Sequence, residues 1–154
     1  MKIRGFEVIK EYHGNDINLP QRKTISSAGY DIEAAKDMDL LPHKVTIVPT
    51  GLKAYMQDDE YLGIHIRSGF SIKNALSLIN GQGIIDADYY DNRENEGHIM
   101  IAIYNHSESL VNIKKGDRIA QGIFYKYLTT DCDEENEKNI RSGGLGSTQG
   151  FNIV

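Results

Sequence analysis

Hydrophobic residues in this chain recur in short runs, and glycine, asparagine and aspartate mark the turns between them. These turn signals recur about every ten residues, which is the spacing typical of a β-sandwich, jelly roll or barrel. The run HIMIAIY at 98–104 is apolar at nearly every position, so we expect a strand buried on both faces. The other predicted strands cover 2–10, 45–48, 53–56, 61–66, 110–113, 119–120 and 123–128.

One short helix interrupts this pattern. It is predicted over 71–78 (SIKNALSL), where Ile72, Ala75 and Leu76 fall on one face. The turn dipeptide Asn80-Gly81 would end it.

The length and composition indicate a single globular domain. With 154 residues, 40% hydrophobic and 25% charged, the chain is long enough for one core and too short for two. It contains no internal repeat and no proline-rich linker. We therefore expect one β domain over 1–140, followed by a glycine-rich C-terminal arm over 141–154.

The formal net charge of -5 argues against a general nucleic-acid-binding surface, which needs cations to replace phosphate counterions. It is compatible with a small anionic substrate held by a few local cations and a metal ion. The sequence shows neither a signal peptide nor an apolar run long enough to span a bilayer, so we expect a cytoplasmic protein that does not bind membranes.

Cysteine and histidine chemistry is largely excluded. Cys132 is the only cysteine, which rules out a disulfide framework and a cysteine zinc site. It lies in the acidic run 131–135, whereas a reactive thiolate needs positive surroundings. The five histidines are scattered without the spacing of metal ligands.

The segment GIIDADYY at 83–90 places two carboxylates beside a hydrophobic strand. If the strand continued, Asp86 and Asp88 would share a face and repel each other. If it ended at Ile85, Asp86 would begin a turn. This segment alone leaves both interpretations open.

Two further segments indicate an anion site. In AGYDIEAA (28–35), Asp31 is either a functional residue or a turn residue with its hydrogen bonds satisfied. The run Arg67-Ser68-Gly69 lies between a predicted strand and the predicted helix, where backbone N–H groups and a guanidinium suit a phosphate. Alternatively, Ser68 caps the helix and Arg67 forms a structural ion pair.

Two amide side chains are candidate ligand contacts. Asn80 carries both a donor and an acceptor and could read a base edge, and it could equally serve only to end the helix. In GDRIAQ (116–121), Gln121 can donate to an oxygen, whereas Asp117 and Arg118 are interpreted as a structural pair within a turn.

The arm segment RSGGLGST (141–148) combines glycines, hydroxyls and an arginine, a composition suited to wrapping phosphates. It is not a P-loop because it has no lysine. It is not a dinucleotide fingerprint because Gln149 stands where the last glycine is needed. The alternative is a flexible tail without a ligand.

Taken together and in order, AGYDIEAA, RSGFSIKN, GIIDADYY, GDRIAQ and RSGGLGST resemble the five motifs of the trimeric dUTP diphosphatase (dUTPase) family. The resemblance implies an all-β, distorted antiparallel jelly roll of the dUTPase-like β-clip type. It also implies a homotrimer with sites shared between subunits, the arm of one closing over a neighbour's site. The implied reaction is Mg²⁺-dependent hydrolysis of dUTP to dUMP and pyrophosphate, which keeps uracil out of DNA and supplies dUMP for thymidylate synthesis.

The resemblance also implies residue roles. Asp86 matches the carboxylate that orients the attacking water, and Asp31 matches the aspartate that holds Mg²⁺ through water. Tyr89 matches the tyrosine under the deoxyribose, where a ribose 2′-OH would clash, and Asp88 is expected to be structural. Phosphate contacts are implied for Arg67, Ser68, Gly69, Gln121, Arg141, Gly146, Ser147 and Thr148. Uracil contacts are implied for Asn80 and for the backbone of Ile84, Ile85 and Met100, in a β-hairpin that imitates the pairing edge of adenine.

Gln149 interrupts the usual end of the fifth motif, and the chain departs from the family pattern in two further places. Leu145 stands where the family commonly has a phenylalanine that stacks on uracil, so Leu145, Phe151 or Tyr90 is expected to cover the base. The segment DNRENEG at 91–97 is longer than the usual turn and is expected to form an extra surface loop. Both features resemble Gram-positive bacterial and phage members.

Other functions on this fold remain as alternatives. dCTP deaminase shares the fold but uses a glutamate and has a different third motif, so Asp86 followed by Tyr89 favours the diphosphatase. Some phage members bind transcriptional repressors, which makes a regulatory protein a second alternative, with 91–97 as the first place to seek the partner. A binding module without activity is disfavoured because both Asp31 and Asp86 are present.

Overall fold

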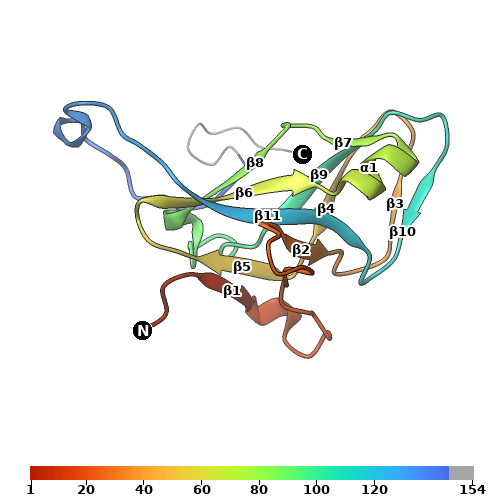
Figure 1. Cartoon of the computed structure of the whole chain (residues 1–154), viewed down its shortest axis with the longest axis horizontal. Helices are drawn as coiled ribbons and strands as arrows, with labels where there is room; N and C mark the ends of the chain where they lie inside the picture. The colour runs from red at the N-terminus through yellow and green to blue at the C-terminus, as the bar shows by residue number, and fades with distance from the viewer. Residues whose placement is uncertain (146–154) are drawn as a thin grey trace.

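The structure is a computed structural model, and it describes residues 1–145 (Figure 1). In this part of the chain every strand pairing is antiparallel, which confirms the predicted all-β class. The strands are β1 (Gly5–Val8), β2 (Tyr30–Glu33), β3 (Met38–Leu40), β4 (Val45–Pro49), β5 (Leu52–Tyr55), β6 (Glu60–Ile66), β7 (Leu76–Leu78), β8 (Gly83–Asp86), β9 (Met100–Asn105), β10 (Val111–Ile113) and β11 (Arg118–Lys126).

Two sheets form the body of the molecule. One has the strand order β2-β11-β6-β8 and the other β4-β9-β7, while β1 pairs with β5 and β3 with β10. Strand β11 lies between β2 and β6 and unites the two short strands expected at 119–120 and 123–128 (Figure 1). Among residues 1–145, strand β8 is the edge of its sheet, which matters for the site because one side of its backbone has no strand partner there.

The hydrophobic core contains residues of both sheets in one cluster. Ile32 and Leu62 come from the four-stranded sheet, and Ile101 and Ile103 come from the three-stranded sheet. The expectation that 98–104 is buried on both faces is wrong for β9, where buried and partly buried positions alternate. The second face of β9 stays partly open because, within the described residues, no further layer covers it.

The part of the chain that the structure describes contains a single α-helix, as predicted, but its bounds differ. α1 covers Ser68–Asn74 instead of 71–78, and Ile72 is 83% exposed instead of facing the core. The helix ends because Ala75 adopts a left-handed conformation (φ 54°). Leu76 then begins strand β7, in which alternate residues are buried against the core. A helical period over the whole segment was therefore the wrong interpretation.

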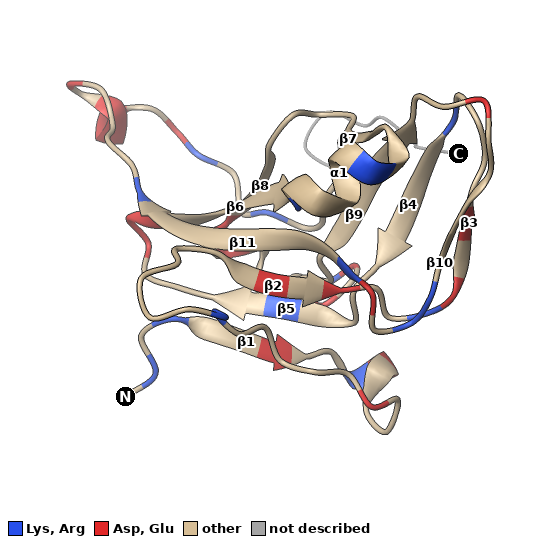
Figure 2. Ribbon diagram, turned by 45° about the vertical axis from the view of Figure 1, so that its right-hand side comes forward, with Lys and Arg blue, Asp and Glu red and all other residues tan. Residues whose placement is uncertain are grey.

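Single-turn 3₁₀ helices and charged loops complete the fold. The 3₁₀ helices are η1 (Lys10–Tyr12), η2 (Ala87–Tyr89) and η3 (Asp133–Glu135). Positive and negative residues are interspersed in the loops, at strand ends and within the short strands β1, β2 and β5 (Figure 2). Among residues 1–145, no helix is both long and apolar enough to cross a membrane.

Candidate active site

A basic pocket lies where β2, β11 and the end of β6 meet. The strand register brings Gln121 opposite both Asp31 of β2 and His65 of β6. The cavity has a volume of about 210 Å³ and contains three cationic side chains against one carboxylate. It is lined by Lys23, Thr24, Ser27, Gly29, Asp31, Arg67, Ser68, Arg118 and Gln121. A pocket of this charge attracts an anion although the whole chain is acidic.

Asp31 is held between two guanidinium groups in this pocket. Its Oδ1 lies 3.2 Å from Arg67 Nε, and its Oδ2 accepts a hydrogen bond from Arg118 Nη1 at 3.1 Å. The expected pairing of Arg118 with Asp117 is wrong, because Asp117 instead accepts a hydrogen bond from the backbone of Lys114 and so stabilises the turn. The sequence therefore identified Asp31 and Arg67 but missed Arg118.

Gly29 and Gln121 fit together at the floor of the basic pocket. A Cβ atom at position 29 would lie 2.1 Å from Gln121 Oε1. Only glycine therefore allows the Gln121 amide to lie against this backbone while it lines the cavity.

The junction predicted at Arg67-Ser68-Gly69 is confirmed, since β6 ends at Ile66 and α1 begins at Ser68. The alternative of a capping Ser68 is wrong, because Arg67 is the N-cap and no side-chain cap hydrogen bond forms. The first amides of a helix have no partner within the helix. They lie beside the basic pocket, of which Arg67 and Ser68 are lining residues.

Two small apolar cavities, each about 80 Å³, adjoin strand β8. Both are lined by Ile84, Ile85, Met100 and Leu145; Tyr89 and Arg141 add to one and Asn80 to the other. The structure thus brings together Asn80, Ile84, Ile85 and Met100, the residues whose amide or backbone is expected to contact a base. An unpaired backbone edge on β8 offers alternating N–H and C=O groups to a planar ligand.

The expected β-hairpin around this cavity is not formed. Asn80 lies in the turn between β7 and β8, but β7 pairs with β9 and β8 pairs with β6. The turn therefore connects two sheets, because the left-handed residue Ala75 had already directed β7 onto the other sheet. Any backbone recognition of a base would come from the edge of β8 instead of a paired hairpin.

Strand β8 ends with Asp86, and the 3₁₀ turn η2 begins at Ala87. The sequence left open whether the strand continues past Ile85 or ends there with a turn. Each interpretation is partly right, because the strand extends one residue beyond Ile85 and the turn follows directly. Arg141 reaches both carboxylates, with Nη2 at 2.5 Å from Asp86 Oδ2 and Nε at 2.7 Å from Asp88 Oδ1. Mutual repulsion of the two aspartates is thereby offset by one guanidinium.

Tyr89 is buried beside the apolar cavities. Its hydroxyl donates a hydrogen bond to the His98 carbonyl oxygen at 2.7 Å and accepts one from Asn95 Nδ2 at 2.8 Å. Burial raises the pKa of the Tyr89 hydroxyl above its ordinary value, so it stays protonated and able to donate.

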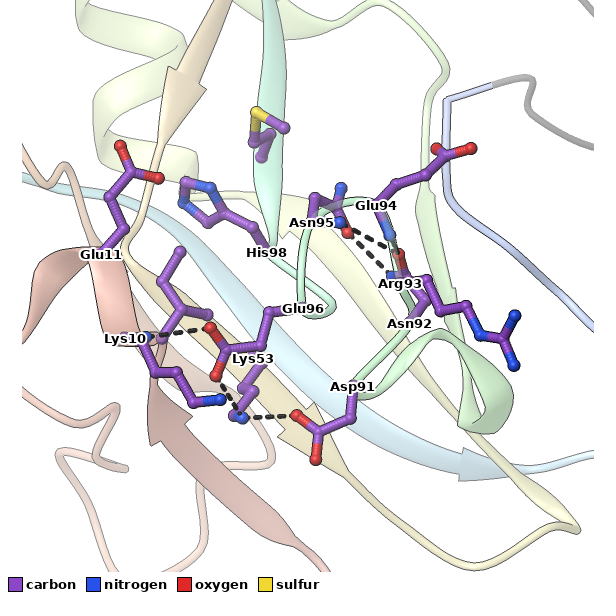
Figure 3. A pocket seen from close by; sticks show the side chains of 12 residues that line it. Lys10, Glu11, Lys53, Asp91, Asn92, Arg93, Glu94, Asn95, Glu96 and His98 are labelled. Atoms are coloured by element: carbon purple, nitrogen blue, oxygen red, sulfur yellow. Dashed lines mark hydrogen bonds and ion pairs between the residues drawn. The ribbon is translucent and has the colours of Figure 1, made fainter.

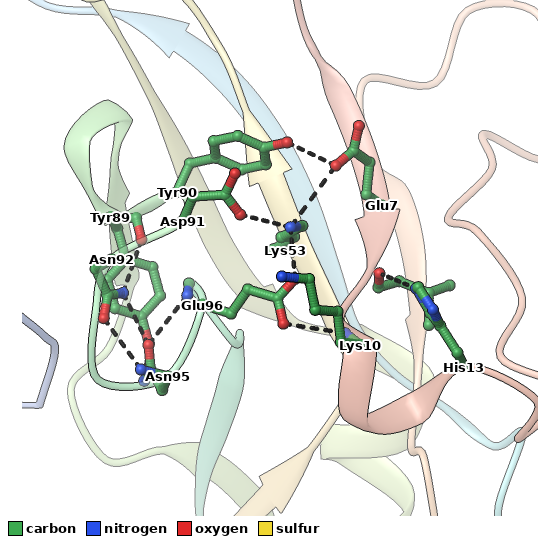
Figure 4. Close-up of polar contacts among 12 residues, drawn as sticks. Glu7, Lys10, His13, Lys53, Tyr89, Tyr90, Asp91, Asn92, Asn95 and Glu96 are labelled. Atoms are coloured by element: carbon green, nitrogen blue, oxygen red, sulfur yellow. Dashed lines mark hydrogen bonds and ion pairs between the residues drawn. The ribbon is translucent and has the colours of Figure 1, made fainter.

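Tyr90 points away from the cavities toward β1 and β5 (Figure 4). Its hydroxyl donates to Glu7 at 2.6 Å, and its ring packs edge-on against Tyr55. Burial, with the Glu7 hydrogen bond, raises the pKa of Tyr90 to about 12. The expectation that Tyr90 could cover the base is therefore wrong. Leu145 lines both apolar cavities, while Gly146, Ser147, Thr148 and Phe151 lie outside the described residues.

The loop 91–97 forms one wall of a broad, open hollow of about 770 Å³ (Figure 3). Lys53 is buried in it and binds Asp91 at 2.5 Å and Glu96 at 2.7 Å. Burial lowers the pKa of Lys53, but these two carboxylates outweigh it and raise the pKa overall. The loop lies at the surface, as expected, with Asp91, Arg93 and Glu94 exposed, and it is folded back onto β5.

Asp86 and the basic pocket lie at opposite ends of one sheet. Asp86 pairs with Tyr61 near the start of β6, whereas Arg67 follows the last residue of that strand. At 3.2–3.4 Å per residue, six residues of strand separate the two regions by about 20 Å. One copy of the described chain therefore cannot bring Asp86 and Arg67 to the same small ligand.

The chain is similar to known proteins over most of its length. The dUTPase family model matches residues 15–149. A curated deoxyuridine 5'-triphosphate nucleotidohydrolase from Lactococcus lactis is 50% identical over 148 residues, covering 96% of this chain and 99% of that protein. One of the same description from Helicobacter pylori is 31% identical, covering 96% of this chain and 97% of that protein.

Solved structures show the same relationship. The crystal structure of a dUTPase from Streptococcus mutans has a TM-score of 0.79 and 42% identity, covering 82% of this chain and 98% of that chain. A dUTPase from phage phi11 of S. aureus has a TM-score of 0.71 at 22% identity, covering 86% of this chain and 95% of that chain. A D95N mutant of the phi11 enzyme is described with a structural Mg(II) ion. At such identity, the phage enzymes are similar in fold alone.

Proposed function

Because the chain belongs to the dUTPase family and is a dUTP diphosphatase, we propose how its own residues carry out this reaction. The enzyme hydrolyses dUTP to dUMP and pyrophosphate, which keeps uracil out of DNA and supplies dUMP for thymidylate synthesis. The proposal rests on one observation: a carboxylate beside an apolar cavity and a basic pocket occupy opposite ends of the same sheet.

Asp86 is the catalytic carboxylate in this proposal. It accepts a proton from a water molecule whose oxygen attacks the α-phosphorus of dUTP. The bond between that phosphorus and the oxygen bridging to the β-phosphate breaks, and pyrophosphate leaves. Asp86 is half-exposed at the end of β8, so a water and a phosphate can both reach it. Arg141, which pairs with Asp86 in the described chain, would move to the triphosphate when substrate is bound.

The basic pocket binds the phosphates. Arg67 offers a planar guanidinium that can contact two phosphate oxygens, and Gln121 offers an amide donor. Ser68 and Gly69 contribute backbone N–H groups at the start of α1. The arm residues Gly146, Ser147 and Thr148, together with Arg141, are proposed to wrap the γ-phosphate.

Mg²⁺ is the proposed cofactor, and the surroundings of Asp31 fit it. Residues 1–145 contain no cluster of three or more His, Cys, Asp or Glu that could hold a metal alone. Mg²⁺ does not require one, because it keeps several waters and binds through one or two carboxylates and substrate phosphates. Each Asp31 oxygen accepts one guanidinium contact and keeps a lone pair for a metal-bound water. When bound, the ion would neutralise charge on the leaving pyrophosphate.

The apolar cavities hold the nucleoside. Uracil would lie between Ile84, Ile85, Met100 and Leu145, with its polar edge facing the free backbone of β8 and the amide of Asn80. Tyr89 would lie under the deoxyribose. A ribose 2′-OH has no space against that ring, so UTP would be rejected.

The active site is proposed to form between subunits. The α- and β-phosphates of dUTP share one bridging oxygen, so Asp86 and the phosphate-binding pocket must lie within a few ångströms of each other. The separation of about 20 Å in one chain therefore requires that a second copy supply one of the two regions. A homotrimer in which each copy gives Asp86 to one neighbour and receives Arg67 from another satisfies this requirement. The arm is proposed to close over the assembled site. We also propose a cytoplasmic location.

The substrate test is pyrophosphate release from dUTP, dCTP, dTTP and UTP, each with and without Mg²⁺. We expect turnover of dUTP alone and only with Mg²⁺. Ammonia release from dCTP would indicate a deaminase instead. Absence of turnover with all four nucleotides would contradict the proposal and favour the regulatory alternative.

A further inference from the structure

We propose that Asn95 is a positioning residue for Tyr89 and thereby sets how strictly the enzyme rejects ribonucleotides. The proposal rests on the proposed role of Tyr89 as the floor under the sugar. It concerns the loop 91–97, to which neither the five motifs nor the reaction assigns a role.

The loop contacts Tyr89 both at its side-chain hydroxyl and at its backbone carbonyl oxygen (Figure 4). At the hydroxyl, Asn95 Nδ2 donates a hydrogen bond at 2.8 Å. At the backbone, Asn92 Nδ2 donates to the Tyr89 carbonyl oxygen at 2.8 Å. The ring is therefore fixed in depth and in tilt by two amides of the same loop.

The Asn95 amide is itself held in one orientation. Its Oδ1 accepts hydrogen bonds from Asn92 Nδ2 at 2.8 Å and from the backbone N–H of Gly97 at 3.1 Å. With its oxygen occupied in this way, Asn95 can present only its NH₂ group to Tyr89. Gly97 is required here, because a Cβ atom at that position would lie 2.7 Å from the Tyr89 carbonyl oxygen.

The other side of the loop is bound to the body of the protein. Lys53 on β5 pairs with Asp91 and Glu96, and Glu96 also accepts a hydrogen bond from the backbone of Lys10 at 3.0 Å (Figures 3 and 4). The loop therefore connects the buried Lys53 to Tyr89. Glu96 alone contacts both Lys53 and Lys10, so the loop remains a support behind the tyrosine when the Asp91 contact is weakened.

Rigidity matters because of the kind of discrimination needed. dUTP and UTP differ by one hydroxyl group, and an apolar pocket rejects an added hydroxyl only weakly unless the wall cannot move. A shift of the Tyr89 ring by a fraction of an ångström would admit the 2′-OH. Asn95 prevents this shift without contacting the substrate.

The test compares kcat/KM for dUTP and UTP in Asn95→Ala, Tyr89→Phe and the double variant. Each single variant should raise the UTP to dUTP ratio by about 10-fold, and Asn95→Ala should change kcat for dUTP less than about 3-fold. The double variant should be no more relaxed than Tyr89→Phe, because Asn95 acts only through the hydroxyl. Asn95→Leu, which removes the donor and keeps nearly the same volume, should behave like Asn95→Ala and replaces it if the alanine variant does not fold.

Asp91→Asn is the matched control, since it weakens the loop's contact with Lys53 and leaves the Asn95 network intact. It should keep the wild-type ratio. An equal loss of discrimination in Asp91→Asn, or a wild-type ratio in both Asn95 variants, would overturn the inference. Tyr89→Ala separates this failure from failure of the proposed function: if it too keeps the wild-type ratio, Tyr89 is not the floor under the sugar.

Discussion

Arg141 bridges Asp86 and Asp88, with its Nη2 atom 2.5 Å from the first carboxylate and its Nε atom 2.7 Å from the second. The bridge joins the first residue of the arm to the end of β8. It also places the cation proposed for the triphosphate directly on the proposed catalytic carboxylate. The two aspartates share one arginine partner, but only Asp86 is proposed to be catalytic, whereas Asp88 is expected to be structural. They therefore form a matched pair for mutation.

Asp86→Asn should lower kcat by roughly 10²–10⁴-fold, because the amide cannot accept the proton of the attacking water. Asp88→Asn removes only an exposed contact to Arg141 and should lower kcat/KM by about fivefold at most. Steady-state kinetics of both variants test the assignment of Asp86. Their melting temperatures show whether each variant is folded. Comparable losses in the two variants would contradict the assignment of Asp86.

Leu145 is predicted to cover the uracil in place of an aromatic residue. Leu145→Ala should raise the KM for dUTP about three- to tenfold, because apolar contact with the base is lost. Tyr90→Phe is the comparison, since Tyr90 contacts Glu7 and Tyr55 outside the cavities, and it should leave KM unchanged. An unchanged KM in Leu145→Ala would show that another residue covers the base.

His98 should make folding stability fall in mildly acidic solution. Its Nε2 accepts a hydrogen bond from the Gly51 backbone N–H at 3.0 Å, and burial lowers the pKa of its ring below 6.5. Between the lowered pKa of the folded state and 6.5, the unfolded chain binds more protons than the folded chain. The His98 contribution to the free energy of unfolding is therefore complete above pH 6.5 and decreases as the pH falls through this window.

Urea unfolding at pH 7.5, 6.5 and 5.5 measures this effect. His98→Gln, whose amide oxygen can still accept from Gly51, should reduce the decrease between the first and last pH. The exposed His106→Gln serves as the control and should retain it. If the free energy of unfolding decreased equally in the wild type and in His98→Gln, other groups would be responsible for the pH dependence. The Glu96 carboxylate is not responsible in this window, because the Lys53 hydrogen bond lowers its pKa below 4.5.

The sequence predicted elements whose signal is local. Most strands, the junction before α1 and the position of Asp86 at the end of β8 follow from patterns within a few residues, whereas β3 and β7 were not predicted as strands. The helix bounds were wrong because Ala75, an ordinary helix-forming residue, adopts a left-handed conformation that only the competing strand pairing of β7 explains.

The basic pocket was only partly predictable because it depends on strand register. Arg118 contacts Asp31 across 87 residues of sequence, and no local pattern distinguishes this contact from a pair with the adjacent Asp117. The contacts of the buried Lys53 with Asp91 and Glu96 likewise join segments about 40 residues apart. The position of Tyr90 could not be read from the sequence either, because its direction is set by Glu7 on another strand.

The central claim is that each active site needs two copies of the chain, one supplying Asp86 and the other Arg67. Asp86→Asn and Arg67→Ala proteins should each be almost inactive alone. Mixed at equal amounts, unfolded and refolded together, they should recover about one quarter of wild-type dUTP turnover, because a random cyclic trimer then contains that share of sites with both residues intact. Turnover that stays at the level of the separate variants, in mixtures shown to exchange subunits, would contradict the shared site.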